Sequence, residues 1–410
     1  MHSTMTRGDR FNESTVFPDT VTSRPTRRLT CKGLYNETPT YHFNAAFSKD
    51  SRFLLFATAR EGGSALMKAE VATGELTVLA VADGIGNGFG DDSHAPFVKG
   101  TLGGGFAGNH TAIAQETNWC AAAIGRTLRA YHLETMEERV LIEDIGPEFR
   151  FGNPVSSIDG KSVLVTRVPK HPDVVRGDPR PKRTYIQACN EEWGGMPTTY
   201  LRVSIDTGRV EEVFHDPKFG SHHIQPCPSD PDLWLIDRDS PPSFWCGGDA
   251  FRSTRAYVLD SRTGGLTEIP PLDEHRFQIH TNWNRTGERI YYHGFAQAGG
   301  TYIGVADKTG KNLWERHFPA SHYGHVSTHT MAEAIITDGL LTSDLVLAIF
   351  YEELDATGTP RLEIIARHET VWGGLAGQYP HPHCHMSPDG KWLAYNKADF
   401  GRTDVYVVQM

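Results

Sequence analysis

The sequence predicts an all-β protein, a seven-bladed β-propeller whose last blade is closed by a strand near the N-terminus. A weak hairpin pattern recurs seven times along the 410 residues. The 41 Gly and 24 Pro favour many short strands over long helices. No segment longer than about ten residues shows the 3.6-residue periodicity of a helix. A two-domain α/β protein is the alternative class.

Each repeat has a short strand, a polar turn and a second apolar strand. The clearest copy is NAAFSKDSRFLLFATA, and HTAIAQETNWCAAAI is the most degenerate. Alternation of apolar and polar residues, broken by Asp-Gly, Ser-Asp or Thr-Gly, is the signal of a hairpin. An alternating strand follows each hairpin, such as YLRVSIDTGRVEEVF, and spacings of roughly 45–70 residues are typical of propeller blades. The seven copies begin at Asn44, His110, Asn153, Ile224, Thr281, His329 and Cys384.

The two ends of the chain indicate how the ring closes. The last repeat stops after VYVVQM, one strand short of a blade, and TRRLT (residues 26–30) resembles an outer strand. Pairing of these segments would remove the open edge of the last blade. We therefore predict a single propeller domain over residues 26–410, preceded by an N-terminal extension over residues 1–25.

Composition and charge exclude several classes of function. Forty basic and 50 acidic residues give a net charge of −10, which argues against a broad nucleic-acid-binding face. No apolar stretch approaches the length of a membrane span, and the N-terminus lacks the apolar region of a secretory signal. Six scattered cysteines without a C-x-x-C pair are typical of reduced thiols. These features predict a cytoplasmic protein that binds neither nucleic acid nor membranes.

Two insertions interrupt the repeats. Residues 84–108 are rich in glycine, and residues 170–195 contain a basic cluster of Arg176, Arg180, Lys182 and Arg183. Long connections on a compact scaffold are often functional. The cluster could bind an anion at the rim of the ring, or it could belong to a solvated loop.

The segment GQYPHPHCHMSPDGKW carries the strongest chemical signal. His381, His383 and His385 alternate, so an extended strand would place all three on one face. Imidazoles separated by one residue can chelate a divalent ion, and Pro380 and Pro382 stiffen the segment. The alternative is a set of channel-lining histidines that bind water.

The pattern Gln-x-x-His-Pro-His followed by Ser-Pro-Asp-Gly resembles the metal-binding strand of the oligogalacturonate lyases. Members of this family are seven-bladed propellers that cleave short oligogalacturonides by β-elimination with a manganese-type ion. The resemblance implies that the metal ligands are Gln378, His381 and His383, together with His325 in GHVSTHTMAEAIITDG. It also implies Mn²⁺, whereas the ligand set alone does not identify the metal, and Zn²⁺ or Ca²⁺ stays an alternative.

The resemblance extends to two candidate catalytic residues. Arg255 in FRSTRAYVLD matches the arginine proposed as the base of the family, and His280 in IHTNWNRTGERIYY matches a family histidine. A guanidinium is rarely neutral, so His280 is chemically the easier base, and both stay candidates. His223, at the start of another inner strand, is a candidate contact for substrate.

We therefore expect a metal-dependent lyase acting on an acidic, uronate-containing oligosaccharide. A cation on the uronate carboxylate would stabilise the charge that develops when a base removes the C5 proton. The alternatives are a lyase for another uronate oligomer, of the glucuronan or ulvan type, a metal-dependent hydrolase or lactonase, and a non-catalytic scaffold.

Overall fold

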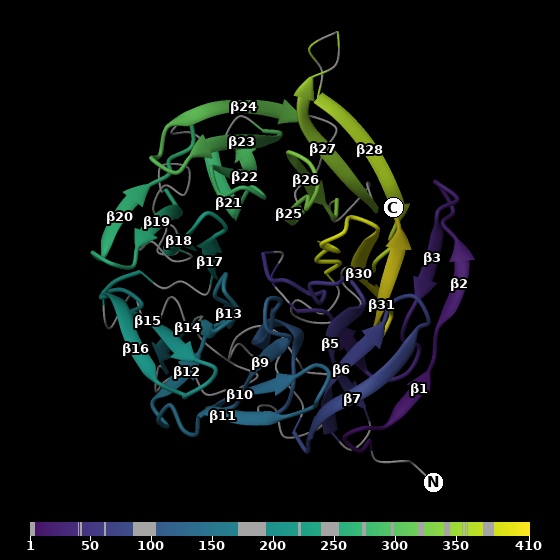
Figure 1. Cartoon of the computed structure of the whole chain (residues 1–410). Coiled ribbons are helices and arrows are strands. Elements are labelled where there is room, and N and C mark those ends of the chain that lie inside the picture. Colours follow the sequence, from purple (N-terminus) through teal and green to yellow (C-terminus); the bar gives the residue numbers. More distant parts are fainter. Residues whose placement is uncertain are drawn as a thin grey trace.

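A computed structural model describes residues 5–39, 41, 43–60, 63–84, 104–170, 194–219, 223–238, 254–272, 276–296, 299–318, 324–339, 345–354, 356, 358, 360–371 and 381–410. Within these ranges the strands form seven sheets arranged as a ring (Figure 1). The same ranges contain no α-helix and a single 3-10 turn, η1 (Gly108–His110). Nor do they contain a helix long and apolar enough to span a membrane. The predicted seven-bladed β-propeller is confirmed.

The first four blades, taken in chain order, contain four or five strands each. Blade 1 has the strand order β1 (Arg10–Asn12), β7 (Glu75–Ala82), β6 (Gly63–Glu70), β5 (Phe53–Arg60) and β4 (Tyr35–Glu37). Blade 2 has β11 (Glu138–Ile142), β10 (Thr127–His132), β9 (Trp119–Ile124) and β8 (Thr111–Ala114). Blade 3 has β16 (Val210–Asp216), β15 (Thr198–Ser204) and β14 (Ser162–Pro169), which pairs with both β12 (Phe149–Phe151) and β13 (Val155–Ser156). Blade 4 has β20 (Gly265–Glu268), β19 (Ala256–Asp260), β18 (Asp230–Asp237) and β17 (His223–Cys227).

The last three blades repeat this order. Blade 5 has β24 (Asn312–Phe318), β23 (Thr301–Asp307), β22 (Arg289–Ala296) and β21 (Arg276–Trp283). Blade 6 has β28 (Pro360–Arg367), β27 (Val346–Leu354), β26 (Ala334–Thr337) and β25 (Val326–Thr328). Blade 7 has β2 (Thr15–Pro18), β3 (Pro25–Arg28), β31 (Arg402–Gln409), β30 (Trp392–Asp399) and β29 (His385–Met386). Because every blade has the same antiparallel order, the inner strands all begin at the same end of the ring.

The ring closes through the N-terminal strand, as the sequence predicts. Strand β3 pairs antiparallel with β31, with Thr26 opposite Val408 and Arg28 opposite Tyr406. Outside it, β2 pairs with β3, and β1 extends the outer edge of blade 1 by pairing with β7. Both β1 and β2 lie in the stretch that we expected to be an N-terminal extension.

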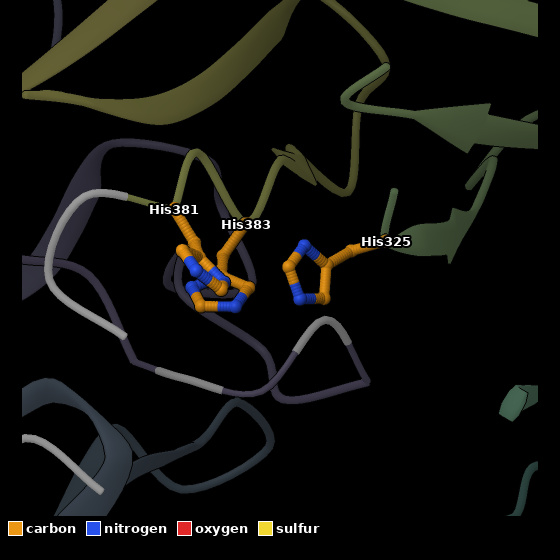
Figure 2. A group of neighbouring side chains, drawn as sticks. All are labelled: His325, His381 and His383. Carbon is orange, nitrogen blue, oxygen red and sulfur yellow. The ribbon is translucent and has the colours of Figure 1, made fainter. Parts of the chain in front are cut away.

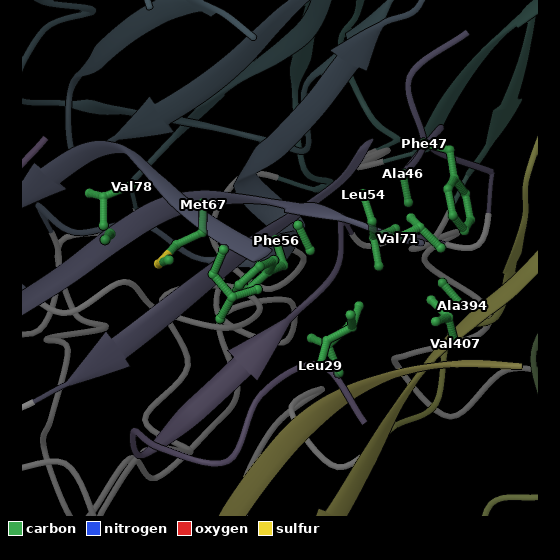
Figure 3. Close-up of a cluster of buried hydrophobic side chains, with 14 residues drawn as sticks. Leu29, Ala46, Phe47, Leu54, Phe56, Met67, Val71, Val78, Ala394 and Val407 are labelled. Carbon is green, nitrogen blue, oxygen red and sulfur yellow. The ribbon is translucent and has the colours of Figure 1, made fainter. Parts of the chain in front are cut away.

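Neighbouring blades pack face to face through clusters of buried apolar side chains. The cluster between blades 7 and 1 combines Leu29, Val405 and Val407 with Phe47 and Phe56 (Figure 3). The next residues of β31, Tyr406 and Val408, belong instead to the cluster between blades 6 and 7. Alternate residues of one strand therefore enter two different interfaces, which explains why many strands are apolar on both faces.

The inner strand of blade 1 is interrupted, and this interruption shapes the centre of the ring. Strand β4 pairs with one half of β5, whereas Phe47 bridges to Leu54 at the other half. Between them the chain leaves the sheet and enters the centre, where a purple segment is visible in Figure 1. Tyr41, on this segment, contacts residues of blades 4 and 6.

Candidate metal centre

Three histidines from two blades converge at the centre of the ring. His325 directly precedes β25 of blade 6, and His381 and His383 lie on the segment that leads into β29 of blade 7. One possible ligand atom from each lies within 4.8 Å of the others, and the side chains point toward one another (Figure 2). The ring centroids of His325 and His383 are 4.2 Å apart. Neutral imidazole nitrogens grouped in this way suit a divalent transition-metal ion.

The backbone around these histidines differs from the expected extended strand. Residues 381–384 are not in a strand, and His383 has φ of 43°, in the left-handed region. The turn at this residue brings His381 and His383 to one site but directs His385 elsewhere, against the backbone of Pro39 and Asn44. The prediction that all three histidines share one face is therefore wrong, because a single left-handed residue breaks the alternation of a strand.

A buried carboxylate, Asp338, organises this site. Its Oδ1 accepts a hydrogen bond of 2.7 Å from the backbone N–H of His325, and its Oδ2 lies 2.8 Å from Nδ1 of the same histidine. The backbone N–H of His383 also donates to Oδ2, at 3.2 Å. Burial alone would raise the pKa of Asp338, but the His325 ring and amide hold this pKa below its usual range. The ionised carboxylate keeps the proton on Nδ1 of His325, so Nε2 presents its lone pair to an ion.

Asp338 lies in the segment GHVSTHTMAEAIITDG that was quoted for His325, but no role was predicted for it from the sequence. Its role follows from the short β25–β26 hairpin, in which Val326 pairs with Thr337 and the Asp338 N–H donates to the His325 carbonyl at 3.3 Å. The sequence did contain a signal for this role: a short hairpin places the carboxylate of Asp338 opposite the candidate ligand His325.

The expected ligands have different outcomes in the structure. Burial lowers the pKa of His381 to about 3, so this imidazole is neutral and able to bind a metal at neutral pH. Gln378, the expected fourth ligand, lies outside the described residues. The structure therefore brings together His325, His381 and His383. The position of the Gln378 amide stays a prediction.

His280 lies beside this group but makes its own hydrogen bonds. It occupies a bulge in β21, with φ of 51°, and its ring centroid is 4.7 Å from that of His325. Its Nδ1 lies 3.0 Å from the carbonyl oxygen of Gly324 and 2.8 Å from Nε2 of His293. Burial lowers the pKa of His293 to about 3, so this neighbour is neutral. The Nε2 of His280 lies 3.2 Å from the hydroxyl of Tyr41.

His223 and Arg255 lie in blade 4, at the end of the ring where the inner strands begin. The Nδ1 of His223 is 3.4 Å from Oδ2 of Asp237, and its ring stacks on Tyr41 with centroids 4.6 Å apart. Arg255 directly precedes β19 and is 4% exposed. Its guanidinium lies 5.4 Å from the ring centroid of Phe277, three residues before His280.

Comparison with family models finds no match, and no curated protein sequence matches the chain. Solved structures do match. An oligogalacturonate lyase from Vibrio parahaemolyticus is 18% identical, with a TM-score of 0.75 over 98% of each chain. An oligogalacturonate lyase in complex with manganese is 20% identical, with a TM-score of 0.75 over 99% of this chain and 98% of the other. The chain has the fold of the oligogalacturonate lyases.

The fold alone does not decide the function. A chain in a crystal structure of the mitotic checkpoint complex also matches, at 10% identity and a TM-score of 0.52 over 91% of both chains. Unrelated activities commonly share one fold, so function has to be argued from the site. The basic cluster of Arg176, Arg180, Lys182 and Arg183 contributes nothing to that argument, because it lies outside the described residues.

Proposed function

We propose that this protein is a metal-dependent lyase that cleaves uronate-containing oligosaccharides, oligogalacturonates first among them, by β-elimination. The observation that carries the proposal is the grouping of His325, His381 and His383 beside the buried Asp338, in a propeller with the fold of oligogalacturonate lyases. The ion that we propose is Mn²⁺, supported by the similar structure solved with manganese. Gln378 is the proposed fourth ligand.

The protein groups prepare this site for a cation and an anionic sugar. When bound, the ion supplies a Lewis acid for the uronate carboxylate, whose charge otherwise opposes removal of the neighbouring C5 proton. His325 and His383 are buried, which keeps bulk water away and strengthens electrostatic interactions at the site. Asp338 holds His325 in the tautomer and orientation that ligation requires.

The elimination also requires proton transfers, for which the remaining candidate residues are available. A base takes the proton from C5, the C5–H electrons form the C4–C5 double bond, and the C4–O4 bond breaks as the leaving oxygen gains a proton. Arg255 and His280 are the candidate bases. His280 is held by the Gly324 carbonyl and the Tyr41 hydroxyl, so it has to exchange the Tyr41 contact before it can take a substrate proton. We propose that His223, oriented by Asp237, contacts the substrate.

Incubation of the Mn²⁺-loaded protein with a panel of sugars tests this proposal. The panel contains oligogalacturonates, their methyl esters, glucuronan-type and ulvan-type oligomers, and neutral oligosaccharides. We expect ultraviolet absorbance from an unsaturated product with oligogalacturonates and none with methyl esters or neutral sugars, because these lack the anionic ligand. Cleavage of another uronate instead changes the substrate assignment. If metal-loaded protein forms no unsaturated product from any uronate, the lyase proposal fails, and release of reducing ends then tests the hydrolase alternative.

Substitution of the two candidate bases separates their roles. Arg255→Ala should lower turnover about 10²–10⁴-fold with unchanged metal content, and Arg255→Lys should recover little because the planar fork is lost. A comparable loss in His280→Ala means that the two residues act together, whereas a small loss leaves Arg255 as the base. Arg202→Ala is the control, because this arginine lies over Trp234 on the blade 3 side of the ring. Full turnover in both Arg255→Ala and His280→Ala would contradict both assignments.

A further inference from the structure

Tyr41 connects blade 1 to four histidines, one from each of blades 4, 5, 6 and 7. It is 5% exposed, and no role was predicted for it from the sequence. Its ring centroid lies 5.2 Å from that of His383, 5.4 Å from His325 and 5.6 Å from His280, besides the stacking on His223. Two of these neighbours are candidate metal ligands, so one aromatic ring restricts rotation of both imidazoles.

The hydrogen bonds of His280 fix the direction in which the Tyr41 hydroxyl points. Nδ1 of His280 lies 3.0 Å from the carbonyl oxygen of Gly324, which can only accept, and 2.8 Å from Nε2 of His293, which in a neutral ring can also accept, so Nδ1 carries the hydrogen. In the neutral imidazole Nε2 then has a lone pair and no hydrogen. The Tyr41 hydroxyl, at 3.2 Å, therefore donates its hydrogen to Nε2. The tyrosine, the histidine and the Gly324 carbonyl form a chain that sets both the tautomer and the orientation of His280.

We propose that Tyr41 is a positioning residue of the metal centre with two separable roles. Its aromatic ring holds His325 and His383 in the arrangement that binds the ion. Its hydroxyl holds His280 with Nε2 unprotonated and directed toward the centre of the channel. The inference rests on the metal site of the proposed function, but it does not require lyase activity.

The role of the ring is tested by Mn²⁺ affinity, measured by calorimetry on the full-length protein. Tyr41→Ala should weaken Mn²⁺ binding about 10–100-fold, the usual effect of removing a partner that orients metal ligands. Tyr41→Phe keeps the ring contacts and should bind Mn²⁺ as the wild type does. The matched control is Tyr35→Phe, which removes a buried hydroxyl of the same blade that donates to the Phe106 carbonyl at 2.7 Å. Wild-type affinity in Tyr41→Ala would overturn this role.

If Tyr41→Ala fails to fold, as judged by its circular dichroism, Tyr41→Leu replaces it. Leucine keeps most of the bulk but has no ring to pack against the imidazoles, so weaker Mn²⁺ binding is again expected. Wild-type affinity in a folded Tyr41→Leu variant would overturn the role equally.

The role of the hydroxyl is tested by the ring nitrogens of His280 in protein labelled with ¹⁵N-histidine. Two-bond ¹H–¹⁵N spectra, assigned with His280→Gln, should show hydrogen on Nδ1 and none on Nε2 in the wild type. Tyr41→Phe should move the Nε2 resonance downfield, because an unprotonated nitrogen loses its donor, and Tyr35→Phe should not. An unchanged Nε2 resonance in Tyr41→Phe would overturn this role.

These outcomes distinguish the inference from the proposed function. A wild-type protein that binds Mn²⁺ but cleaves no uronate refutes the lyase and leaves both readouts for Tyr41 intact. Wild-type Mn²⁺ affinity in Tyr41→Ala, in a protein that does cleave uronates, refutes the role of the ring and leaves the lyase standing.

Discussion

Single residues decide which histidines of the His-x-His-x-His run can share an ion. The left-handed conformation of His383 bends the chain, so that its ring and that of His381 meet His325 while His385 turns to Pro39 and Asn44. A pattern of alternating residues predicts ligands only as long as the backbone stays extended. The histidine types and spacing were readable from the sequence, but the turn that sorts them was not.

Because His383 meets His325 and His385 does not, the two histidines should differ in their effect on Mn²⁺ binding. His383→Ala should remove most Mn²⁺ binding, because it deletes one of three converging imidazoles, whereas His385→Ala should retain it. Metal analysis after dialysis against dilute Mn²⁺ measures both, and His385→Ala serves as the matched control because it removes a buried imidazole from the same segment. Equal metal loss in the two variants would contradict the geometry.

Asp338 is predicted to act through His325. In Asp338→Asn the side-chain oxygen can still accept from the His325 backbone N–H, which leaves the amide N–H₂ facing Nδ1. An imidazole that accepts at Nδ1 carries its hydrogen on Nε2 and no longer offers a lone pair there. Mn²⁺ affinity should therefore fall about 10–100-fold, as titration calorimetry would show. Unaltered affinity in a folded Asp338→Asn protein would mean that the carboxylate does not set the tautomer.

At the scale of elements, the repeat in the sequence predicted the hairpins well but not their interruptions. The turn Ser387-Pro388-Asp389-Gly390 lies between β29 and β30, where the Ser-Pro-Asp-Gly pattern indicated it. The break in the inner strand of blade 1 was not visible, because it depends on contacts of Tyr41 with residues far along the chain, such as His280. Periodicity reports on local pairing and carries no information about such contacts.

The β2–β3 hairpin offers a pH-dependent test of an element. Asp19 accepts hydrogen bonds from the backbone N–H groups of Val21 and Thr22 within the hairpin and from that of Arg367, the last residue of β28 in blade 6. Burial alone would raise the pKa of Asp19, but these hydrogen bonds outweigh it and lower the pKa. Because the folded pKa lies below the unfolded value of about 3.9, the stabilisation is complete above that pH and is lost as pH falls through the folded pKa.

Asp19→Asn should therefore lower the free energy of unfolding by roughly 2 kcal/mol at pH 7, and by much less at a pH below the pKa of the Asp19 carboxyl in the folded protein. Urea denaturation at both pH values measures the difference. Asp9→Asn is the control, because this exposed carboxylate accepts only from the Thr6 N–H among the described residues. A loss that is the same at both pH values would show that the charge of Asp19 is not responsible.

At the scale of the whole molecule, the ring gathers residues that are far apart in the sequence. Because each inner strand begins at the same end, residues at these starts, such as His223 of blade 4, His325 of blade 6 and His383 of blade 7, all contact Tyr41 at that end. These histidines could be proposed from the sequence, because each lies one to four residues before a recognised repeat. Their mutual distances could not, because these depend on the size and tilt of seven packed sheets.

Closure of the ring is tested by two truncations. Removal of residues 1–30 deletes β3, exposes the edge of β31 and removes Leu29, whose buried side chain alone contributes about 2–3 kcal/mol. Removal of residues 1–24 deletes only β1 and β2 and leaves β3 paired with β31. The melting temperature should therefore fall strongly in the longer truncation and less in the shorter one. The longer truncation should also self-associate, because an unpaired edge strand is a template for another chain, and size-exclusion chromatography would detect this. If the longer truncation melts at the wild-type temperature, the pairing of β3 with β31 does not hold the ring closed.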